Sequence, residues 1–387
     1  SNEMPWAHRP KPPPSSALSP EGCETDEIQF INTGSGISLN TTQILSLRNS
    51  MKLFQIQDEW SPDHLKLNEA SIPSPGPGEV LLEMKAASLN YRDLVVLRRG
   101  YGAQTGTLPL IPVSDGAGVV QETGSGVSEL SEGDRVCPLF MQNWLAGSPN
   151  RKKLSSTLGG PIDGVMAEYR CFPESGVYPV PEHLSDVEAA TLPCAALTAW
   201  SALIGEGRIQ PGESVLIQGT GGVSLFALQF AKMAGARAIL ISGSEEKMKQ
   251  ASQLGADDVL NYRSQPEWGK IIRDLAGGDG VDHIIEVGGT DTLPQSLRAI
   301  RPGGTISMIG VLSGHEMKAQ LGLIVTRQIR LQGITVGHRQ GFENMCRAIN
   351  RHQLKPVVDQ VYPFESLPEA LDRLAGGQHF GKICFGF

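Results

Sequence analysis

Hydrophobic positions follow two different patterns along the chain. Between residue 51 and about residue 176, short apolar runs such as 80–89, 110–122 and 134–140 are broken by Gly and Pro, which is typical of the strands of a β-barrel or sandwich. From about residue 185, apolar runs of strand length alternate with segments of helical spacing. Apolar strands separated by helices predict a parallel sheet that is covered by helices on both faces.

The second pattern predicts a regular α/β series. Strands are expected at 214–218, 237–241, 258–262, 282–287, 305–311 and 329–336, with helices that reach 234, start at 245, and lie near 267–276 and 292–300. At 387 residues the chain is too long for one ordinary core, so two domains are expected. The expected divisions are a flexible extension over 1–50, which contains PKPPPSS, a first domain over 51–176, a second over 177–338, and a tail over 339–387 that rejoins the first.

Composition narrows the range of partners. Hydrophobic residues make up 40% of the chain, but no uninterrupted apolar run approaches the roughly 18 residues that span a bilayer, so no membrane contact is expected. The net charge of −8 would repel a phosphate backbone, which argues against nucleic acid. The six cysteines are scattered without a C-x-x-C pair, and this favours a reducing, cytoplasmic location.

The segment SVLIQGTGGVSLFALQF places a glycine loop between a predicted strand and a predicted helix. Gly219 would permit the tight turn, Gly221 would let the backbone approach a pyrophosphate, and the N–H groups at the helix start would receive the phosphate charge. An ordinary strand-to-helix turn is the alternative, but several βα units follow, so we favour a dinucleotide site. The loop consists of Gly219, Thr220, Gly221, Gly222, Val223 and Ser224, the last a small residue in place of a third glycine.

The end of the next strand bears on which nicotinamide cofactor is preferred. An acidic side chain there would bind the ribose hydroxyls of NAD, whereas this chain has Ser242, Gly243 and Ser244, followed by Lys247. Hydroxyl donors and a cation suit a 2′-phosphate, so the sequence predicts NADP(H) in preference to NAD(H). The alternative is a plain helix cap by Ser244 beside a solvated Lys247.

Several further segments are jointly specific, namely ASLNYRDL, RRGYG, PVSDGAGVVQETGSGVSELSEGDRV, PCAALTAW, LGADDVLNYR, VGG, PGGTISMIG and HFGK. With the glycine loop, they make residues 51–387 resemble the medium-chain dehydrogenase/reductase superfamily, and within it the zinc-free quinone oxidoreductase-like (alcohol dehydrogenase-like) branch. The resemblance implies an α/β fold class, with a Rossmann doubly wound parallel sheet joined to a GroES-like β-barrel catalytic domain. It also implies an active site between the two domains.

The resemblance bears on metal content at two positions. Zinc enzymes of the superfamily carry a catalytic Cys where this chain has Asn90, and Gly-His-Glu where it has Val113, Ser114 and Asp115. A catalytic zinc needs about three protein ligands drawn from His, Cys and carboxylate, which Asp115 alone cannot supply. The sequence therefore predicts no zinc, and hydrogen bonds would have to polarise the substrate instead.

The resemblance also suggests site residues. A tyrosine in a segment like RRGYG serves as the acid in related metal-free enoyl reductases, which makes Tyr101 the first candidate and Tyr91 the second, although either could be structural. Other residues are expected around the cofactor, although Thr198, Tyr262, Arg263 and Lys382 could instead be ordinary structural or surface residues. They are Asn90, Asp93, Thr198, Tyr262, Arg263, Gly310, Val311, Gly381 and Lys382.

Together these features predict an NADPH-dependent, metal-independent oxidoreductase that reduces activated C=C bonds or quinones by hydride transfer. Two alternatives stay open: a zinc-free carbonyl or alcohol oxidoreductase that uses the same site, and a non-enzymatic nucleotide-binding or RNA-binding module that has kept the fold. The strand expected at 329–336 comes last in its series and is expected at a sheet edge that needs cover, so a homodimer is predicted.

Overall fold

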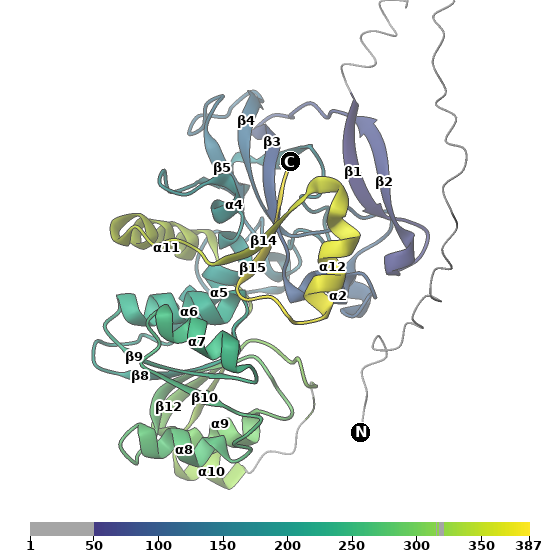
Figure 1. The fold of residues 1–387 in the computed structure, drawn as a ribbon. Helices are drawn as coiled ribbons and strands as arrows, with labels where there is room; N and C mark the ends of the chain where they lie inside the picture. Colours follow the sequence, from purple (N-terminus) through teal and green to yellow (C-terminus); the bar gives the residue numbers. More distant parts are fainter. Residues whose placement is uncertain (1–49, 315, 317–320) are drawn as a thin grey trace, which may run out of the picture. The chain divides into compact units, whose positions relative to one another are not determined.

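The computed structural model describes residues 50–387 except 315 and 317–320. The extension expected over 1–50 therefore lies outside the described residues, apart from Ser50. Two large β-sheets and the helices packed on them account for most of the described chain (Figure 1).

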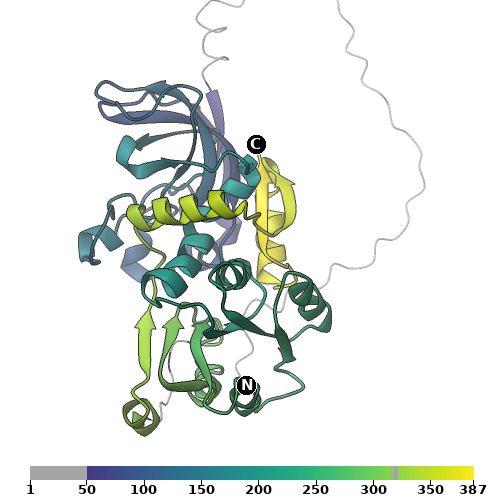
Figure 2. The ribbon, with the colours of Figure 1, turned by 90° about the vertical axis from the view of Figure 1, so that its left-hand side faces the viewer.

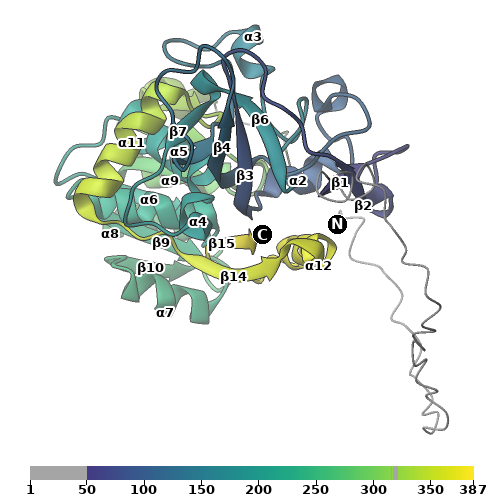
Figure 3. The ribbon, with the colours of Figure 1, turned by 90° about the horizontal axis from the view of Figure 1, so that it is seen from above.

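The first large sheet is built from both ends of the described chain. Its strand order is β14-β15-β3-β4-β5-β7, β6 also pairs with β3, and β1 and β2 form a separate hairpin. The tail strand β15 lies beside β3 (Figure 3). The two strands are antiparallel, with Cys384 opposite Ser88. Because β7 pairs with β5, the sheet continues past the boundary expected at residue 176. The strands are β1 (Ser50–Ile56), β2 (Leu65–Ser71), β3 (Glu79–Ser88), β4 (Asp115–Thr123), β5 (Arg135–Pro138), β6 (Tyr169–Pro173), β7 (Val177–Pro179), β14 (Val358–Pro363) and β15 (Lys382–Gly386).

The second sheet is parallel, and its six strands follow the order β10-β9-β8-β11-β12-β13. Counted from the first strand this is 3-2-1-4-5-6, the order of a doubly wound Rossmann sheet, so the predicted architecture is confirmed. β13 lies at one edge (Figure 2) and is shorter than the strand expected over 329–336. The strands are β8 (Ser214–Gln218), β9 (Arg237–Ser242), β10 (Asp258–Asn261), β11 (Val281–Glu286), β12 (Ile300–Met308) and β13 (Arg330–Gly333).

Alternate residues of the parallel strands serve two separate cores. Val215 and Ile217 of β8 belong to the core that contains Phe226 and Phe230 of α6, whereas Leu216 belongs to the core that includes α8 and α9. Strand side chains alternate between faces, so the continuous apolar run of β8 is buried on both. The helices are α2 (Tyr91–Val96), α3 (Arg151–Leu154), α4 (Asp186–Ala189), α5 (Leu197–Trp200), α6 (Gly222–Met233), α7 (Glu245–Gln253), α8 (Trp268–Leu275), α9 (Leu293–Ala299), α10 (Leu321–Thr326), α11 (Arg339–His352) and α12 (Leu367–Ala375).

A helical run over Asp186–Gly205 leads into the parallel sheet. It alternates α4 and α5 with two π-helical stretches, Leu192–Ala196 and Ser201–Gly205. By length and composition this run could cross a membrane, but 72% of its most apolar window is buried inside the protein, as in a core helix. The π-helical turn at Leu192–Ala196 matters for the site, since such turns often occur at functional positions.

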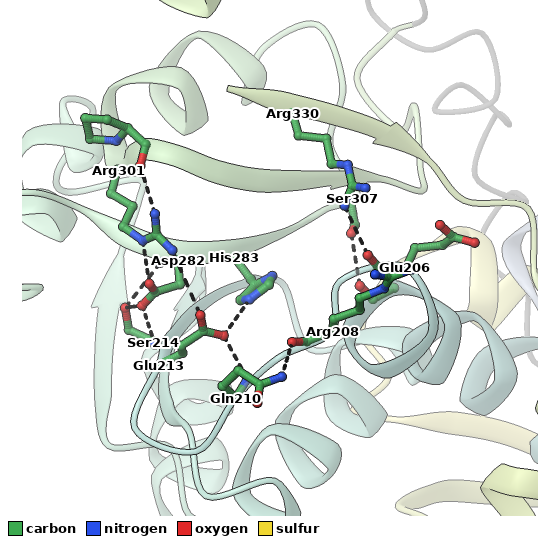
Figure 4. A network of polar contacts seen from close by, with 12 residues as sticks. Glu206, Arg208, Gln210, Glu213, Ser214, Asp282, His283, Arg301, Ser307 and Arg330 are labelled. Carbon is green, nitrogen blue, oxygen red and sulfur yellow. Dashed lines mark hydrogen bonds and ion pairs between the residues drawn. The ribbon is translucent and has the colours of Figure 1, made fainter. Parts of the chain in front are cut away.

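A polar network ties together the amino ends of three parallel strands (Figure 4). Asp282 accepts a hydrogen bond from Ser214 Oγ at 2.8 Å and pairs with Arg301, while Glu213 lies 2.9 Å from His283 Nε2. Ligands of such sheets bind beyond the opposite, carboxyl ends of the strands. We therefore treat this network as structural.

Candidate active site

The glycine loop has the geometry of a diphosphate cradle. Gly219 has a φ of +75°, which suits glycine, and Gly221 stands at the N-cap of α6 without a side-chain cap. A methyl group added to Gly221 would meet no described atom within 4 Å, so there is open space beside the loop. Ser224 Oγ donates to the Gln218 carbonyl at 2.7 Å, so the serine replaces the third glycine without losing contact with the strand. The first residues of α6, from Gly222 and Val223 on, thus offer N–H groups to a phosphate.

The tail of the chain closes against this loop. The Gly381 N–H donates to the Thr220 carbonyl at 3.0 Å. Lys382 lies one residue further on, and its stem crosses the start of α6: a Cβ on Gly222 would lie 2.4 Å from Lys382 Cδ. Glycine is therefore required at 222 to let the lysine pass.

Lys247 binds the tail of the chain. Its ammonium donates to the carbonyls of Gly377 at 2.8 Å and His379 at 2.9 Å, so it fastens the tail to α7. Ser244 caps α7 by accepting from the Lys247 N–H, while Ser242 is buried at the end of β9. The expected contact between Lys247 and a 2′-phosphate stays a prediction; in this structure these two carbonyls bind the ammonium.

Two other side chains lie over Gly243, at the end of β9. A Cβ at Gly243 would lie 2.6 Å from Arg263 Nε and 2.9 Å from the Tyr262 hydroxyl. The nearby Glu245 carboxylate accepts a hydrogen bond from Asn261 Nδ2. Arg263 and Tyr262 therefore lie at the end of β9, where the sequence predicts the ribose, and Arg263 is a second candidate cation there beside Lys247.

A buried carboxylate supports the loops expected under the nicotinamide. Glu286 is fully buried at the end of β11 and accepts from Gln218 Nε2 at 2.7 Å and from the N–H groups of Gly288 and Gly289. Gly310 packs so closely that a Cβ there would lie 2.4 Å from the Val287 carbonyl oxygen. The loops that these contacts hold in place include Gly310 and the exposed Val311. Thr198, which was also expected near the cofactor, is buried on α5.

A chain of hydrogen bonds runs through Asn90 and Ser114, the two residues that stand where zinc enzymes of the superfamily carry ligands. Lys382 Nζ, which is almost fully buried, donates to Asn90 Oδ1 at 2.6 Å and to the Leu89 carbonyl. Asn90 Nδ2 lies 3.4 Å from Ser114 Oγ, which is 3.0 Å from Asp115 Oδ1. Asp115 Oδ2 accepts from the Cys194 N–H at 3.0 Å. Burial raises the pKa of Asp115, and the Lys382 charge opposes that rise.

Asp93 is a second buried carboxylate beside this chain. Its Oδ2 accepts from the Asn90 N–H at 2.7 Å, which begins α2, while its Oδ1 is buried without a hydrogen-bond partner among the described atoms. Burial raises its pKa to about 6, with the charge of Arg92 opposing the rise. Arg92 is itself held by the carbonyls of Leu158 and Gly160, each at 2.9 Å.

Both candidate tyrosines are partly exposed. Tyr101 is 45% exposed and Tyr91 44% exposed. Burial of the Tyr101 hydroxyl raises its pKa, and Arg92 opposes this, followed by smaller effects of Cys194 and Asp93. A raised pKa keeps the Tyr101 phenol protonated at neutral pH, as a proton donor requires.

The donor set does not fit a catalytic zinc. No group of three or more His, Cys, Asp or Glu side chains is placed to hold a metal within residues 50–314, 316 and 321–387. Asn90 Oδ1 already accepts from an ammonium, and Asp115 accepts from Ser114 and Cys194. Burial also raises the pKa of the Cys194 thiol, which opposes formation of the thiolate that a metal prefers.

Comparison with known proteins places the chain in a family. Residues 76–182 match the alcohol dehydrogenase GroES-like domain and residues 222–351 match the zinc-binding dehydrogenase family. A zinc-type alcohol dehydrogenase-like protein of Schizosaccharomyces pombe is 41% identical over 85% of this chain and 97% of its own length. The chain belongs to the medium-chain dehydrogenase/reductase superfamily. It is therefore an NAD(P)-dependent oxidoreductase, and the non-enzymatic alternative is set aside.

Other relatives bear on the branch within the superfamily. The solved structure of a protein from Sinorhizobium meliloti 1021 is 42% identical, with a TM-score of 0.83 over 88% of this chain and 99% of that one. A quinone oxidoreductase of Rattus norvegicus is 30% identical over 83% of this chain and 92% of its own length. The nearer named relatives are thus zinc-type alcohol dehydrogenases, which favours the alcohol dehydrogenase-like alternative over the predicted quinone oxidoreductase branch.

Sequence reasoning missed three contributors to the site. Cys194 lies in an apolar helix, where a lone cysteine is most simply a core residue. Arg92 and Glu286 are charged residues that belong to no recognised motif in the surrounding sequence. The one available signal was that Glu286 interrupts an otherwise apolar strand end, DHIIEV, since a carboxylate there must find buried partners.

Proposed function

We propose that the protein is an NADP(H)-dependent, metal-independent oxidoreductase that interconverts carbonyl compounds and alcohols. The observation that carries the proposal is the hydrogen-bond chain from Lys382 through Asn90 and Ser114 to Asp115, which occupies the positions at which zinc enzymes of the superfamily hold ligands. The higher identity to alcohol dehydrogenase-like relatives supports the carbonyl and alcohol substrate class.

The preference for NADP(H) is supported by the ribose end. Arg263 and Tyr262 lie over Gly243, and a guanidinium and a phenol are good donors to a phosphate. Glu245, the nearest acidic residue after the strand, is bonded to Asn261. This set suits a 2′-phosphate better than free ribose hydroxyls.

The cofactor, when bound, supplies or accepts the hydride. The residues of the chain hold and orient it: the first turn of α6 receives the diphosphate, and the loops pinned by Glu286 support its reactive end. Tyr101, protonated at neutral pH, donates the proton that completes reduction of a carbonyl. In the reverse direction the same phenol oxygen would receive the proton from an alcohol.

A second candidate function is reduction of enones or quinones. The half-exposed Tyr101 is compatible with it, because a phenol can donate to an enolate oxygen as well as to an alkoxide. Quinone oxidoreductases among the relatives, at 29 to 30% identity, support it further.

The test is an NADPH-consumption screen over matched substrates. A saturated ketone, an aldehyde, an enone and a quinone would be compared, each with and without a chelator, alongside elemental analysis of the purified protein. We expect aldehyde or ketone turnover that a chelator leaves unchanged. One tightly bound zinc per chain, with activity lost to the chelator and restored by zinc, would contradict the metal-independent mechanism, and turnover confined to enones and quinones would favour the second candidate.

A further inference from the structure

Lys382 is a buried ammonium with one side-chain acceptor. The residue is 3% exposed at the first position of β15, its stem crosses α6 beside Gly222, and its Nζ reaches Asn90 Oδ1 at 2.6 Å and the Leu89 carbonyl. A charge removed from water needs such partners, since an unpaired one costs several kcal/mol. The lysine therefore joins the cofactor cradle to the wall of the reaction site.

This contact fixes which way the Asn90 carboxamide points. An ammonium can only donate hydrogen bonds, so the atom that faces Lys382 must be the amide oxygen. The amide nitrogen then points to the opposite side, where one of its hydrogens is directed at Ser114 Oγ, 3.4 Å away. The Asn90 amide also bonds the Asp115 carboxylate and so opposes the rise of its pKa. Ser114 Oγ and Asp115 Oδ1 are only 3.0 Å apart, so one N–H can face both acceptors and leave the second hydrogen outside the chain.

The direction of the remaining bonds follows from the same rule. Ser114 Oγ, which accepts from Asn90, donates to Asp115 Oδ1, and Asp115 Oδ2 accepts from the Cys194 N–H. The chain thus runs from a cation to a carboxylate, and bonds in such a chain polarise one another. Asn90 lies near its cationic end and is only half-buried, so its free N–H can reach a bound molecule.

We propose that the second N–H of Asn90 is the donor that binds the substrate carbonyl oxygen, and that Lys382 is the positioning residue that orients and polarises it. The inference rests on the proposed function. As hydride reaches the carbonyl carbon, negative charge develops on the oxygen. Asn90 stabilises that charge by a hydrogen bond and does not transfer its proton. The proton that completes the reduction comes from Tyr101. Loss of one such donor typically lowers kcat by about 10² to 10³.

The first test needs no activity. In the full-length protein labelled with ¹⁵N at asparagine, the Asn90 side-chain amide signal is assigned by its loss in Asn90→Asp. Lys382→Met, which keeps the stem beside Gly222 but removes the charge, should shift that signal, and Lys382→Arg should partly restore it. Lys232→Met, which removes a lysine paired with Asp257 near the far end of α6, should leave it in place. An Asn90 signal insensitive to Lys382→Met would overturn the pairing.

The second test is a kinetic double-mutant cycle at saturating NADPH. We expect Lys382→Met and Asn90→Asp each to lower kcat for a carbonyl substrate by 10-fold or more, and the double variant to be no worse than Asn90→Asp. If Lys382 served only the diphosphate, Lys382→Met would instead raise the KM for NADPH with kcat unchanged. The fold-effects of the two single variants on kcat/KM would then multiply in the double variant. That outcome overturns the positioning role. A parent protein that turns over no carbonyl would overturn the proposed function and the donor role together, while the amide signal still decides the pairing.

Discussion

Replacing Arg263 with Gln should weaken NADPH binding and leave NADH binding unchanged. Arg263 Nε lies over Gly243 at the end of β9, where the ribose 2′-position of a dinucleotide is expected, whereas the Lys247 ammonium is bonded to two tail carbonyls. Only NADPH carries a phosphate at that position, so only NADPH should lose a partner. Gln keeps much of the side-chain stem and removes the charge.

The size of the effect follows from the bond that is lost. A hydrogen bond to a charged group contributes about 1.5 to 3 kcal/mol, and each 1.4 kcal/mol changes a dissociation constant about tenfold. We therefore expect the Kd of NADPH to rise by about 10- to 150-fold. Salt screens charges near the surface, so the titrations should be compared at one fixed ionic strength.

Lys247→Met is the matched control. Its ammonium fastens Gly377 and His379 to the start of α7, so its loss should loosen the tail and weaken NADPH and NADH by a similar factor. Fluorescence titration of both cofactors against the parent and the two variants gives all six constants. If Lys247→Met were selective for NADPH and Arg263→Gln were not, the lysine would have to leave its carbonyls for the phosphate, and the assignment of Arg263 would be refuted.

Three further outcomes are expected. Ser242→Asp should reverse or erase the preference for NADPH, because a carboxylate there repels a 2′-phosphate and accepts from ribose hydroxyls; an unchanged ratio of dissociation constants would count against a ribose site at this strand end. The protein should be a homodimer through the edge strand β13, where Leu331 is 41% exposed, so light scattering should give about twice the chain mass of 41.5 kDa, and a mass near 41.5 kDa at micromolar concentration would oppose it. The raised pKa of Asp93 means that the native state binds the proton more tightly than the unfolded chain. The unfolding free energy of the parent should therefore fall by about 2 kcal/mol as pH rises from about 4 to about 6, relative to Asp93→Asn, and parallel pH profiles for the two proteins would contradict the shift.

The parallel sheet could be predicted because its strands carry their signal locally. A strand buried on both faces must be apolar at successive positions, and the run SVLIQ therefore defined β8 over the same residues, 214–218. The glycine loop was equally local, since a turn and a helix start lie within six residues. In both cases the residues that interact are near neighbours in the chain.

The contacts that organise the site are not local, and this is why they were missed. Lys382 and Asn90 lie 292 positions apart, and Asp115 and Cys194 lie 79 apart. No spacing rule connects such pairs. Lys247 was predicted beside the ribose from the nearby strand end, and its contacts with the carbonyls of Gly377 and His379, which come from a distant part of the chain, have no local signal.

Val113 shows how a site can keep its backbone while its chemistry changes. The stretch 110–114 was expected to be a strand, but Val113 has a φ of +68° and β4 begins only at Asp115. Glycine adopts such a φ freely, whereas a β-branched residue there costs on the order of 1 to 3 kcal/mol. The conformation is enforced from outside: the Val113 carbonyl accepts from the Val165 N–H at 2.9 Å, and the backbones at Gly159 and Gly164 lie directly against it. The backbone held in this way places the next residue, Ser114, with its Oγ between Asn90 Nδ2 and Asp115 Oδ1. The strained residue therefore directly precedes the serine that links the hydrogen-bond chain.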